Sequence, residues 1–94
     1  MTISPDFRPK LAAKARLRYD RHSDRHMLLY PEKGLALNAT GTEIVKLCTG
    51  EQTVREIIAS LSARYDGAPA EKLEQEVLAF LEALRARGLL EETP

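Results

Sequence analysis

The segment from Gly34 to Ile57 constrains the fold most, because it combines a strand, two helix starts and a glycine helix stop. Leu35 and Leu37 alternate with a small residue, so residues 34–38 predict a short β-strand. Two Thr-x-x-Glu patterns follow, and each predicts a capping box in which hydroxyl and carboxylate satisfy backbone N–H groups at a helix start. The two boxes are Thr40 with Glu43 and Thr53 with Glu56. A strand followed this closely by two helices indicates an α+β fold.

The residues before this segment predict two more strands. Apolar and charged residues alternate over residues 15–20, which is typical of a half-buried strand. Residues 27–30 form a short apolar run, and residues 31–34 contain the proline and glycine of a hairpin connection. We therefore expect a three-stranded antiparallel meander over residues 15–38. Residues 1–11 contain two prolines without a sustained period, and they predict an irregular arm.

The second half of the chain predicts three helices, over residues 41–49, 54–65 and 71–87. Gly50 and Gly88 suit the left-handed conformation that ends a helix, and Leu89 or Leu90 can fold back onto the last turn. At about 100° per residue, one stripe of the third helix is apolar and predicts its core face. This stripe consists of Leu73, Val77, Phe80 and Leu84. Residues 91–94 predict a frayed tail.

These elements predict one domain over residues 1–94, with an N-terminal three-stranded sheet followed by a three-helix bundle at 41–88. Three helices with a β-hairpin resemble a winged helix. The 94 residues carry 14 Lys/Arg and 14 Asp/Glu, but residues 1–33 have a net charge of +4 and residues 34–94 have −4. The basic first third is suited to an acidic partner, with Arg16, Arg18 and Arg21 as the candidate surface.

Composition also indicates where the chain works. The sequence has no run of 18 apolar residues, which argues against a membrane span, and its first residues lack the apolar centre of a secretory signal. A single cysteine excludes an internal disulfide and fits the reducing cytoplasm.

Catalytic and metal-binding patterns are weak in this sequence. His22 and His26 have a helical metal-ligand spacing, but they fall in a predicted hairpin, where that spacing has no such meaning. Cys48 lies on the inner face of a short predicted helix, where a buried thiol is inert. No glycine-rich nucleotide loop and no nucleophile with a base at motif spacing occurs. We therefore expect neither an enzyme nor a cofactor.

Two features together suggest a groove for an extended peptide. Residues 34–38 form an outer strand of the meander, and an edge strand can take up an added strand through its unpaired backbone groups. The third helix has an apolar shoulder beside its core stripe, formed by Glu74, Leu78, Leu81 and Arg85. The simpler alternatives are that the edge is inert and that the meander or the N-terminal arm covers the shoulder.

A winged-helix interaction module or DNA-binding regulator is the alternative function. Residues 71–87 of the third helix carry three Lys/Arg and four Glu, so this helix would be repelled by phosphate. We therefore expect no nucleic-acid partner. An exposed strand edge also allows a homodimer or an exchange of hairpins between chains.

The order and spacing of several motifs resemble the family of pyrroloquinoline quinone (PQQ) biosynthesis protein D and related peptide-recognition domains. The resemblance covers roughly residues 12–92. It is carried by LLYPEKGLALN at 28–38, Gly41, IVKLCTG at 44–50, TVREI at 53–57, and Val77, Phe80, Leu81, Leu84, Gly88 and Leu89.

This resemblance implies a peptide chaperone that is not itself an enzyme. Such a protein binds a ribosomally made precursor peptide by strand addition and presents it to a radical S-adenosylmethionine enzyme. Arg85 is then expected to pair with a peptide carboxylate, and Leu78 and Leu81 to receive apolar side chains. The expected peptide-binding residues are Gly34, Leu35, Ala36, Leu37, Asn38, Glu74, Leu78, Leu81 and Arg85.

Overall fold

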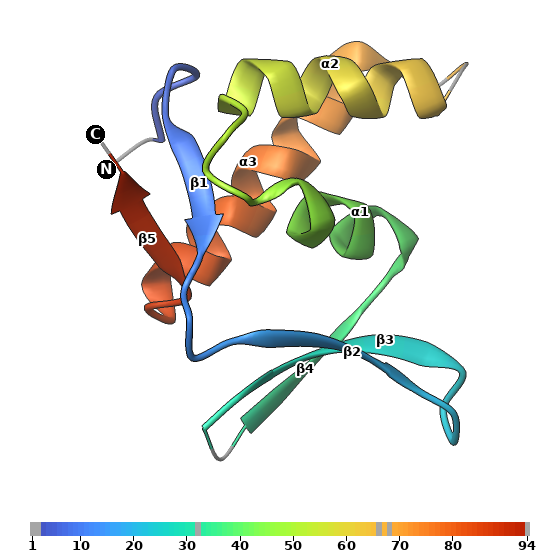
Figure 1. Ribbon diagram of the computed structural model, residues 1–94. Helices are drawn as coiled ribbons and strands as arrows, with labels where there is room; N and C mark the ends of the chain where they lie inside the picture. Colours follow the sequence, from blue (N-terminus) through green and yellow to red (C-terminus); the bar gives the residue numbers. More distant parts are fainter. Residues whose placement is uncertain (1–2, 32, 66, 68, 94) are drawn as a thin grey trace.

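The computed structural model of the chain describes residues 3–31, 33–65, 67 and 69–93, which contain three helices and five strands (Figure 1). Four strands come first, three helices follow, and the fifth strand ends the described chain. The strands form two separate antiparallel sheets. The expected α+β class is confirmed. The winged-helix likeness stays a prediction.

The larger sheet is the expected meander of three strands: β2 (Arg16–Asp20), β3 (Arg25–Tyr30) and β4 (Lys33–Leu37). Leu28 occupies its centre, because it pairs with Leu17 on β2 and with Leu35 on β4, and its side chain is fully buried. Since side chains alternate across a strand, Met27 and its partners lie on the opposite face. Tyr30 pairs with Lys33 at the hairpin end, and Glu32 of the expected connection lies outside the described residues.

The three helices are α1 (Ala39–Leu47), α2 (Val54–Arg64) and α3 (Ala70–Ala86). The capping box of α2 is confirmed, because Glu56 N–H donates to Thr53 Oγ1 at 3.1 Å and Thr53 N–H donates to Glu56 Oε1 at 2.8 Å. After α3, Gly88 has a φ of +71° and Leu89 N–H donates to the Leu84 carbonyl at 2.9 Å. The predicted helix stop and fold-back at residues 88–89 are therefore also confirmed.

The start of α1 differs from the prediction. Asn38, and not Thr40, is the N-cap, and its Oδ1 accepts a hydrogen bond from Gly41 N–H at 2.7 Å. Asparagine is among the strongest N-cap residues, so the helix begins before the Thr40–Glu43 pattern is reached. The strand consequently ends at Leu37, and Asn38 lies beyond β4.

The ends of the described chain form a second sheet, so the expected irregular arm is wrong at residues 8–11 and the expected frayed tail is wrong at residues 91–93. Residues 1, 2 and 94 of these expectations lie outside the described residues. β1 (Arg8–Leu11) pairs antiparallel with β5 (Leu90–Thr93). Ile3, in the segment expected to be irregular, is also buried. No local pattern reveals this pairing, because each strand is four residues long and its partner lies at the other end of the chain. Pro9 is accommodated because its carbonyl still accepts a hydrogen bond, from Gly50 N–H at 2.9 Å.

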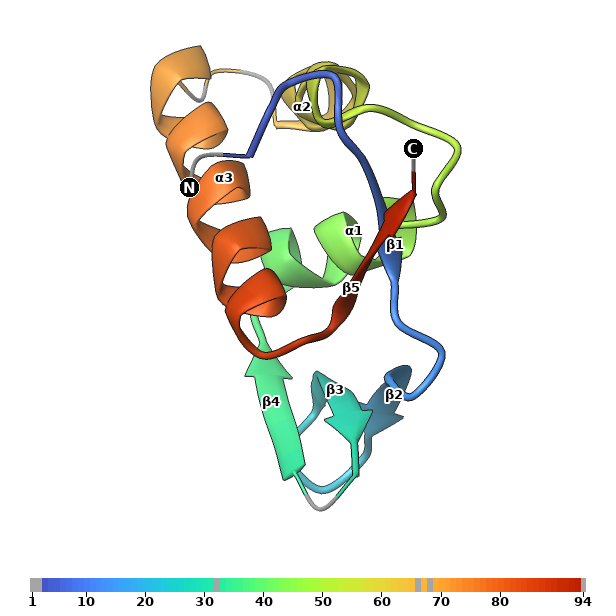
Figure 2. The ribbon, with the colours of Figure 1, turned by 90° about the vertical axis from the view of Figure 1, so that its left-hand side faces the viewer.

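The core lies between the helices and the inner face of the meander, with β1 and β5 closing one side (Figures 1 and 2). Its fully buried large side chains include Leu28, Ile44, Ile57, Leu61, Leu81, Leu84 and Leu89. None of the helices in the described part of the chain is both long and apolar enough to cross a membrane.

Candidate peptide-binding groove

β4 is an edge of the meander. It pairs with β3 on one side, and no described strand pairs with its other side (Figure 2). β2 forms the opposite edge, but it carries the exposed residues Arg16 and Arg18, and charged side chains of this kind discourage strand addition. β4 carries one charged residue, Lys33, at its first position. β4 is therefore the better template for an added strand.

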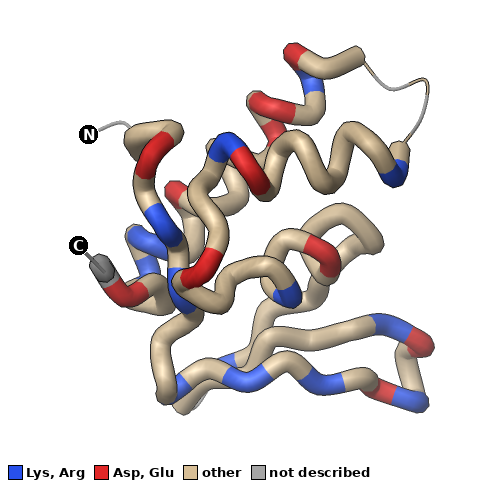
Figure 3. The backbone as a smooth tube through the Cα atoms, turned by 45° about the horizontal axis from the view of Figure 1, so that its top comes forward, with Lys and Arg blue, Asp and Glu red and all other residues tan. Residues whose placement is uncertain are grey.

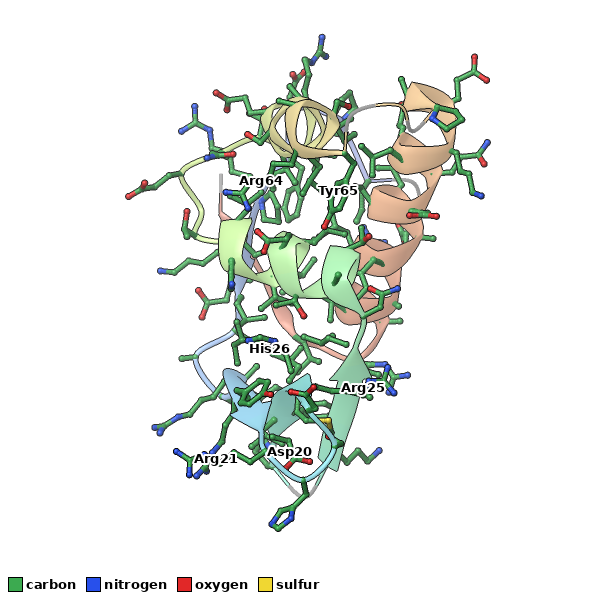
Figure 4. The ribbon with its side chains drawn as sticks, turned by 90° about the vertical axis from the view of Figure 1, so that its right-hand side faces the viewer. Asp20, Arg21, Arg25, His26, Arg64 and Tyr65 are labelled. Carbon is green, nitrogen blue, oxygen red and sulfur yellow. The ribbon has the colours of Figure 1, made fainter. Side chains whose placement is uncertain are left out.

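A cavity of about 300 Å³ lies between this edge and the C-terminal half of α3. Residues 35–38 form one wall, and Phe80, Ala83 and Arg87 form the other. Arg25 also lines the cavity, and Figure 4 shows it beside β4. One wall is thus an unpaired strand edge, and the other is an apolar flank of α3. Arg25 supplies a guanidinium group on the sheet side, and Arg87 supplies one on the helix side.

A second cavity of about 410 Å³ continues the first and shares Asn38 and Phe80 with it. The first turn of α1 and the α3 residues Glu76, Ala79 and Phe80 enclose it. Gly41 allows this close approach of the two helices, since an added Cβ would lie 3.2 Å from Phe80 Cε1 and 3.1 Å from Asn38 Oδ1. The glycine therefore positions the Phe80 ring where the two cavities meet.

The predicted β4 residues lie at this groove with different exposures. Gly34 and Ala36 are exposed, Leu35 is half-buried and Leu37 is buried. Leu35, Ala36 and Leu37 line the first cavity, whereas Gly34 does not. Asn38 lines both cavities, but its carbonyl accepts hydrogen bonds from the Thr42 N–H and hydroxyl groups. That carbonyl is occupied by α1, so strand addition is restricted to residues 33–37.

The predicted helix shoulder faces elsewhere. Leu81 has 0% exposure and belongs to the core, so the expectation that it receives a peptide side chain is wrong. Glu74, Leu78 and Arg85 lie outside both cavities that border α3. At about 100° per residue, the core stripe has two flanks, and residues 76, 80, 83 and 87 lie on the flank opposite to 74, 78 and 85. Helical periodicity predicted the Leu78 flank as the groove wall, but periodicity alone does not show which flank faces β4.

Sequence reasoning therefore missed four residues that line the first cavity: Arg25, Phe80, Ala83 and Arg87. It also missed Glu76 and Ala79 of the second cavity. Phe80 was placed in the core stripe, where Leu81 lies instead. The pairing of bulky Phe80 with Gly41 was an available signal, because both residues belong to the motifs that carry the family resemblance. Arg25 and Arg87 had no local signal, since only the fold brings them to one cavity.

Within the described part of the chain, no Cys or His side chain lines either cavity. Burial raises the pKa of the Cys48 thiol to about 12, and Cys48 lies in the core and not in the groove. His26 is half-buried with its ring 5.2 Å from that of Tyr19, whereas His22 is exposed in the turn. Among the described residues, no three His, Cys, Asp or Glu side chains cluster as metal ligands would. The arrangement is suited to binding an extended chain.

Residues 25–90 match the family model described as coenzyme PQQ synthesis protein D (PqqD). The chain belongs to the PqqD family. A relative from Bradyrhizobium diazoefficiens, named PqqA binding protein, is 35% identical over 98% of this chain and 88% of that protein. The protein of the same name from Pseudomonas aeruginosa PAO1 is 36% identical over 94% of both chains.

Two solved structures resemble this PqqD-family chain. The solution structure of the PqqD part of Methylobacterium extorquens PqqCD superimposes with a TM-score of 0.81, at 32% identity, over 96% of this chain and 95% of that one. It represents a functional, stand-alone recognition element for ribosomally synthesised and post-translationally modified peptides. The second structure is TbiB1 in complex with the TbiA(β) leader peptide. It superimposes with a TM-score of 0.73 at 24% identity, over 90% of this chain and 98% of TbiB1, and it shares the fold.

Proposed function

We propose that this chain is a non-catalytic peptide chaperone of PQQ biosynthesis that binds the ribosomally made precursor peptide PqqA. The observation that carries the proposal is the unpaired edge of β4, which faces Phe80, Ala83 and Arg87 across a cavity. Relatives with more than 30% identity over nearly the whole chain are named PqqA binding proteins. Both lines of support point to an extended peptide as the ligand.

The proposed mode of binding is strand addition. Backbone groups of residues 33–37 pair with the peptide, and peptide side chains on one face pack against Leu35, Leu37 and Phe80. Burying two apolar peptide side chains contributes roughly 3–5 kcal/mol before the entropy of ordering the peptide is subtracted. The backbone pairing therefore contributes affinity that does not depend on the peptide sequence, and the side-chain contacts add affinity and set the register.

An NMR titration with PqqA tests this proposal. Amide shifts are expected to cluster at residues 33–38 and at Phe80, Ala83 and Arg87, and to leave β1 unchanged. Shifts confined to the Leu78 and Arg85 flank would instead support the site expected from the sequence. Shifts in neither region, at saturating peptide, would refute binding by this groove.

We also propose that the bound peptide is presented to a radical S-adenosylmethionine enzyme in the cytoplasm. The candidate docking surface is the outer face of the meander, where Arg16 and Arg18 pair with Leu29 and Met27. Lys and Arg positions recur along this sheet in Figure 3. An Arg16→Glu, Arg18→Glu variant should bind PqqA normally and lose peptide crosslinking by the enzyme. Normal crosslinking would remove this surface from consideration.

A homodimer is a separate proposal, because the edge of β4 could also pair with that of a second copy. Light scattering of the free chain and of the PqqA complex tests it. If the peptide and the second copy compete for β4, then the mass should fall to that of one chain with one peptide. A monomer at all concentrations without peptide would rule the dimer out.

A further inference from the structure

The two cavities beside α3 differ in charge. The lower cavity, between β4 and the end of α3, is lined by Arg25 and Arg87 and by no carboxylate of the described chain. The upper cavity, beside the start of α1, is lined by Glu76 and by no Lys or Arg of the described chain. Because the cavities share Asn38 and Phe80, they form one groove with Glu76 at one end and Arg87 at the other. Arg25 precedes the His26–Leu37 pair, so it lies beside the shared Asn38 and not at the Arg87 end.

The charges at the two ends are available to a ligand. No ion pair found among the described residues uses Glu76, Arg25 or Arg87. Glu76 and Arg87 are exposed, and the Arg87 Nη1 donates a hydrogen bond to the Tyr30 hydroxyl at 3.2 Å. Tyr30 pairs with Lys33, so this hydrogen bond places Arg87 at the beginning of β4. Glu76 lies with Asn38 at the opposite end of the strand.

Helix geometry gives the separation of the two ends. Glu76 and Arg87 are eleven residues apart on α3. At about 1.5 Å per residue, this separation is roughly 16 Å along the helix. An extended chain covers that length in about five residues at about 3.3 Å each. Because successive side chains of a strand point to opposite faces, two peptide side chains that both face α3 are about four or about six positions apart. The apolar residues Phe80 and Ala83 lie between the two charges.

The sheet fixes the direction of an added strand relative to these charges. Both existing pairs in the meander are antiparallel, and antiparallel pairing is the more stable arrangement. A peptide antiparallel to β4 enters with its N-terminal side near Asn38 and Glu76. It leaves with its C-terminal side near Lys33 and Arg87.

We infer that the groove selects peptides by the order of their charges: a basic residue first, apolar residues next, and an acidic residue about four or about six positions after the basic one, on the same face of the added strand. Lys or Arg of the peptide pairs with Glu76, its carboxylate pairs with Arg87, and its apolar residues pack on Phe80. This inference rests on the proposed function. It adds to that function a class of peptide and a reason why only one direction is bound.

Two synthetic peptides test the inference against the intact chain. The first has one lysine, a leucine and a valine in the middle, and one glutamate about six positions after the lysine, so that both charges lie on the same face of an added strand. The second is identical except that lysine and glutamate are exchanged. Binding is measured by fluorescence anisotropy at low salt, where exposed ion pairs contribute most. We expect the lysine-first peptide to bind roughly fivefold to tenfold more tightly than the exchanged peptide.

A charge-reversed variant provides the decisive comparison. Glu76→Lys combined with Arg87→Glu keeps the net charge and should invert the preference, so that the glutamate-first peptide binds better. The matched control is Lys72→Glu with Glu74→Lys, which exchanges two exposed charges on α3 outside both cavities and should preserve the original preference. Raising the salt concentration should shrink the preference in both proteins.

The outcomes separate this inference from the proposed function. Equal affinities of the two peptides for the native chain would overturn the charge-order inference. Binding of PqqA with no detectable binding of either synthetic peptide would also overturn it and leave the proposed function intact. Failure to bind PqqA would refute the proposed function. A preference that persists unchanged in the Glu76→Lys, Arg87→Glu variant would show that other residues read the charge order.

Discussion

β1 and β4 are both short strands, but β1 has backbone hydrogen-bond partners on both sides, whereas β4 has a partner strand on one side among the described residues. β1 pairs with β5 on one side, and on its other side Leu11 N–H donates to the Cys48 carbonyl at 2.9 Å while the Pro9 carbonyl accepts from Gly50. The segment before β1 continues this contact, because Val54 N–H donates to the Phe7 carbonyl at 2.8 Å. β4 pairs with β3 alone, and its other side borders a cavity.

This difference shows that an edge is closed by remote segments and not by its own composition. β5 and the α1–α2 connection meet β1 only after the chain has folded, whereas no described strand reaches β4. Closing the β1 side contributes to stability, because Leu89 and Cys48 are buried there. On the open side, the backbone N–H and C=O groups at the edge of β4 have no partner strand, and an added peptide can supply one. The comparison predicts that mutations on the two sides separate stability from binding.

The largest effect is expected on the closed side, from Leu89→Ala. Leu89 has 0% exposure and links the end of α3 to β5. Truncating a fully buried leucine removes its transfer free energy and leaves a cavity, so the free energy of unfolding should fall by about 3 kcal/mol. Urea denaturation monitored by circular dichroism measures this loss.

The control for Leu89→Ala is Ile58→Ala on α2, whose side chain is only half-buried and should cost clearly less. Peptide affinity of the folded Leu89→Ala protein should be unchanged. A loss below about 1 kcal/mol would mean that the second sheet contributes little to the fold.

On the open side, Phe80→Ala should have the opposite effect: it should weaken peptide binding more than it lowers the free energy of unfolding. The Phe80 ring lines both cavities and is only partly buried against the core. Its removal should weaken PqqA binding roughly tenfold to a hundredfold, as is usual for a central aromatic contact, measured by isothermal titration calorimetry.

Leu78→Ala is the matched control for Phe80→Ala, because Leu78 is a half-buried apolar residue on the opposite flank of the same helix. It should leave affinity unchanged. If Leu78→Ala weakens binding and Phe80→Ala does not, then the peptide lies on the flank expected from the sequence.

The Cys48 thiol reports on the closed side directly. Burial raises its pKa to about 12, so at about pH 8 only about one molecule in ten thousand carries the thiolate. Reaction with Ellman's reagent should therefore be far slower than in urea-unfolded protein. The Leu89→Ala variant should react faster, because β1 and β5 open more often, whereas saturating PqqA should change the rate little. Rapid reaction of the native chain would show that this side is not closed.

The two sides also differ in how far sequence reasoning could describe them. The three helices and the Thr53–Glu56 box follow local rules of periodicity and capping and are confirmed, although α1 begins before the residue expected. The strands β2, β3 and β4 follow the local rule of alternation. The β1–β5 pair does not, because neither four-residue strand has a period long enough to recognise. Pairing between chain ends is a property of the folded topology.

The groove was predictable only in part, because some of its residues follow local patterns and others are brought together by the fold. Alternation correctly placed Leu35 and Leu37 in a strand, but it could not show that Asn38 leaves that strand to cap α1. Phe80 and Leu81 lie about 100° apart on α3, at opposite margins of the core stripe, so the packing of the neighbouring elements decides which one is buried. Arg25 and Arg87 are brought together by the fold alone.

The smallest expected effect concerns the Glu56 carboxyl beside the closed side. The hydrogen bond from Thr53 N–H, followed by that from the Thr53 hydroxyl and a smaller attraction to Arg8 of β1, lowers its pKa below the usual 4.5. Because the folded-state pKa is the lower one, Glu56 contributes stability fully above about pH 4.5, and this contribution is lost as the pH falls through the folded value.

Arg8→Ala should therefore raise the pKa of Glu56 slightly, whereas Arg16→Ala, on the separate meander, should leave it unchanged. Carboxyl chemical shifts followed by NMR during a pH titration measure both variants. A Glu56→Gln variant should lack this part of the acid dependence. Because Arg8 acts only if β1 is held near the start of α2, an unchanged Glu56 pKa in Arg8→Ala would indicate that β1 is not fixed there in solution. The contrast between a closed and an open edge would then have to rest on the β1–β5 pairing alone.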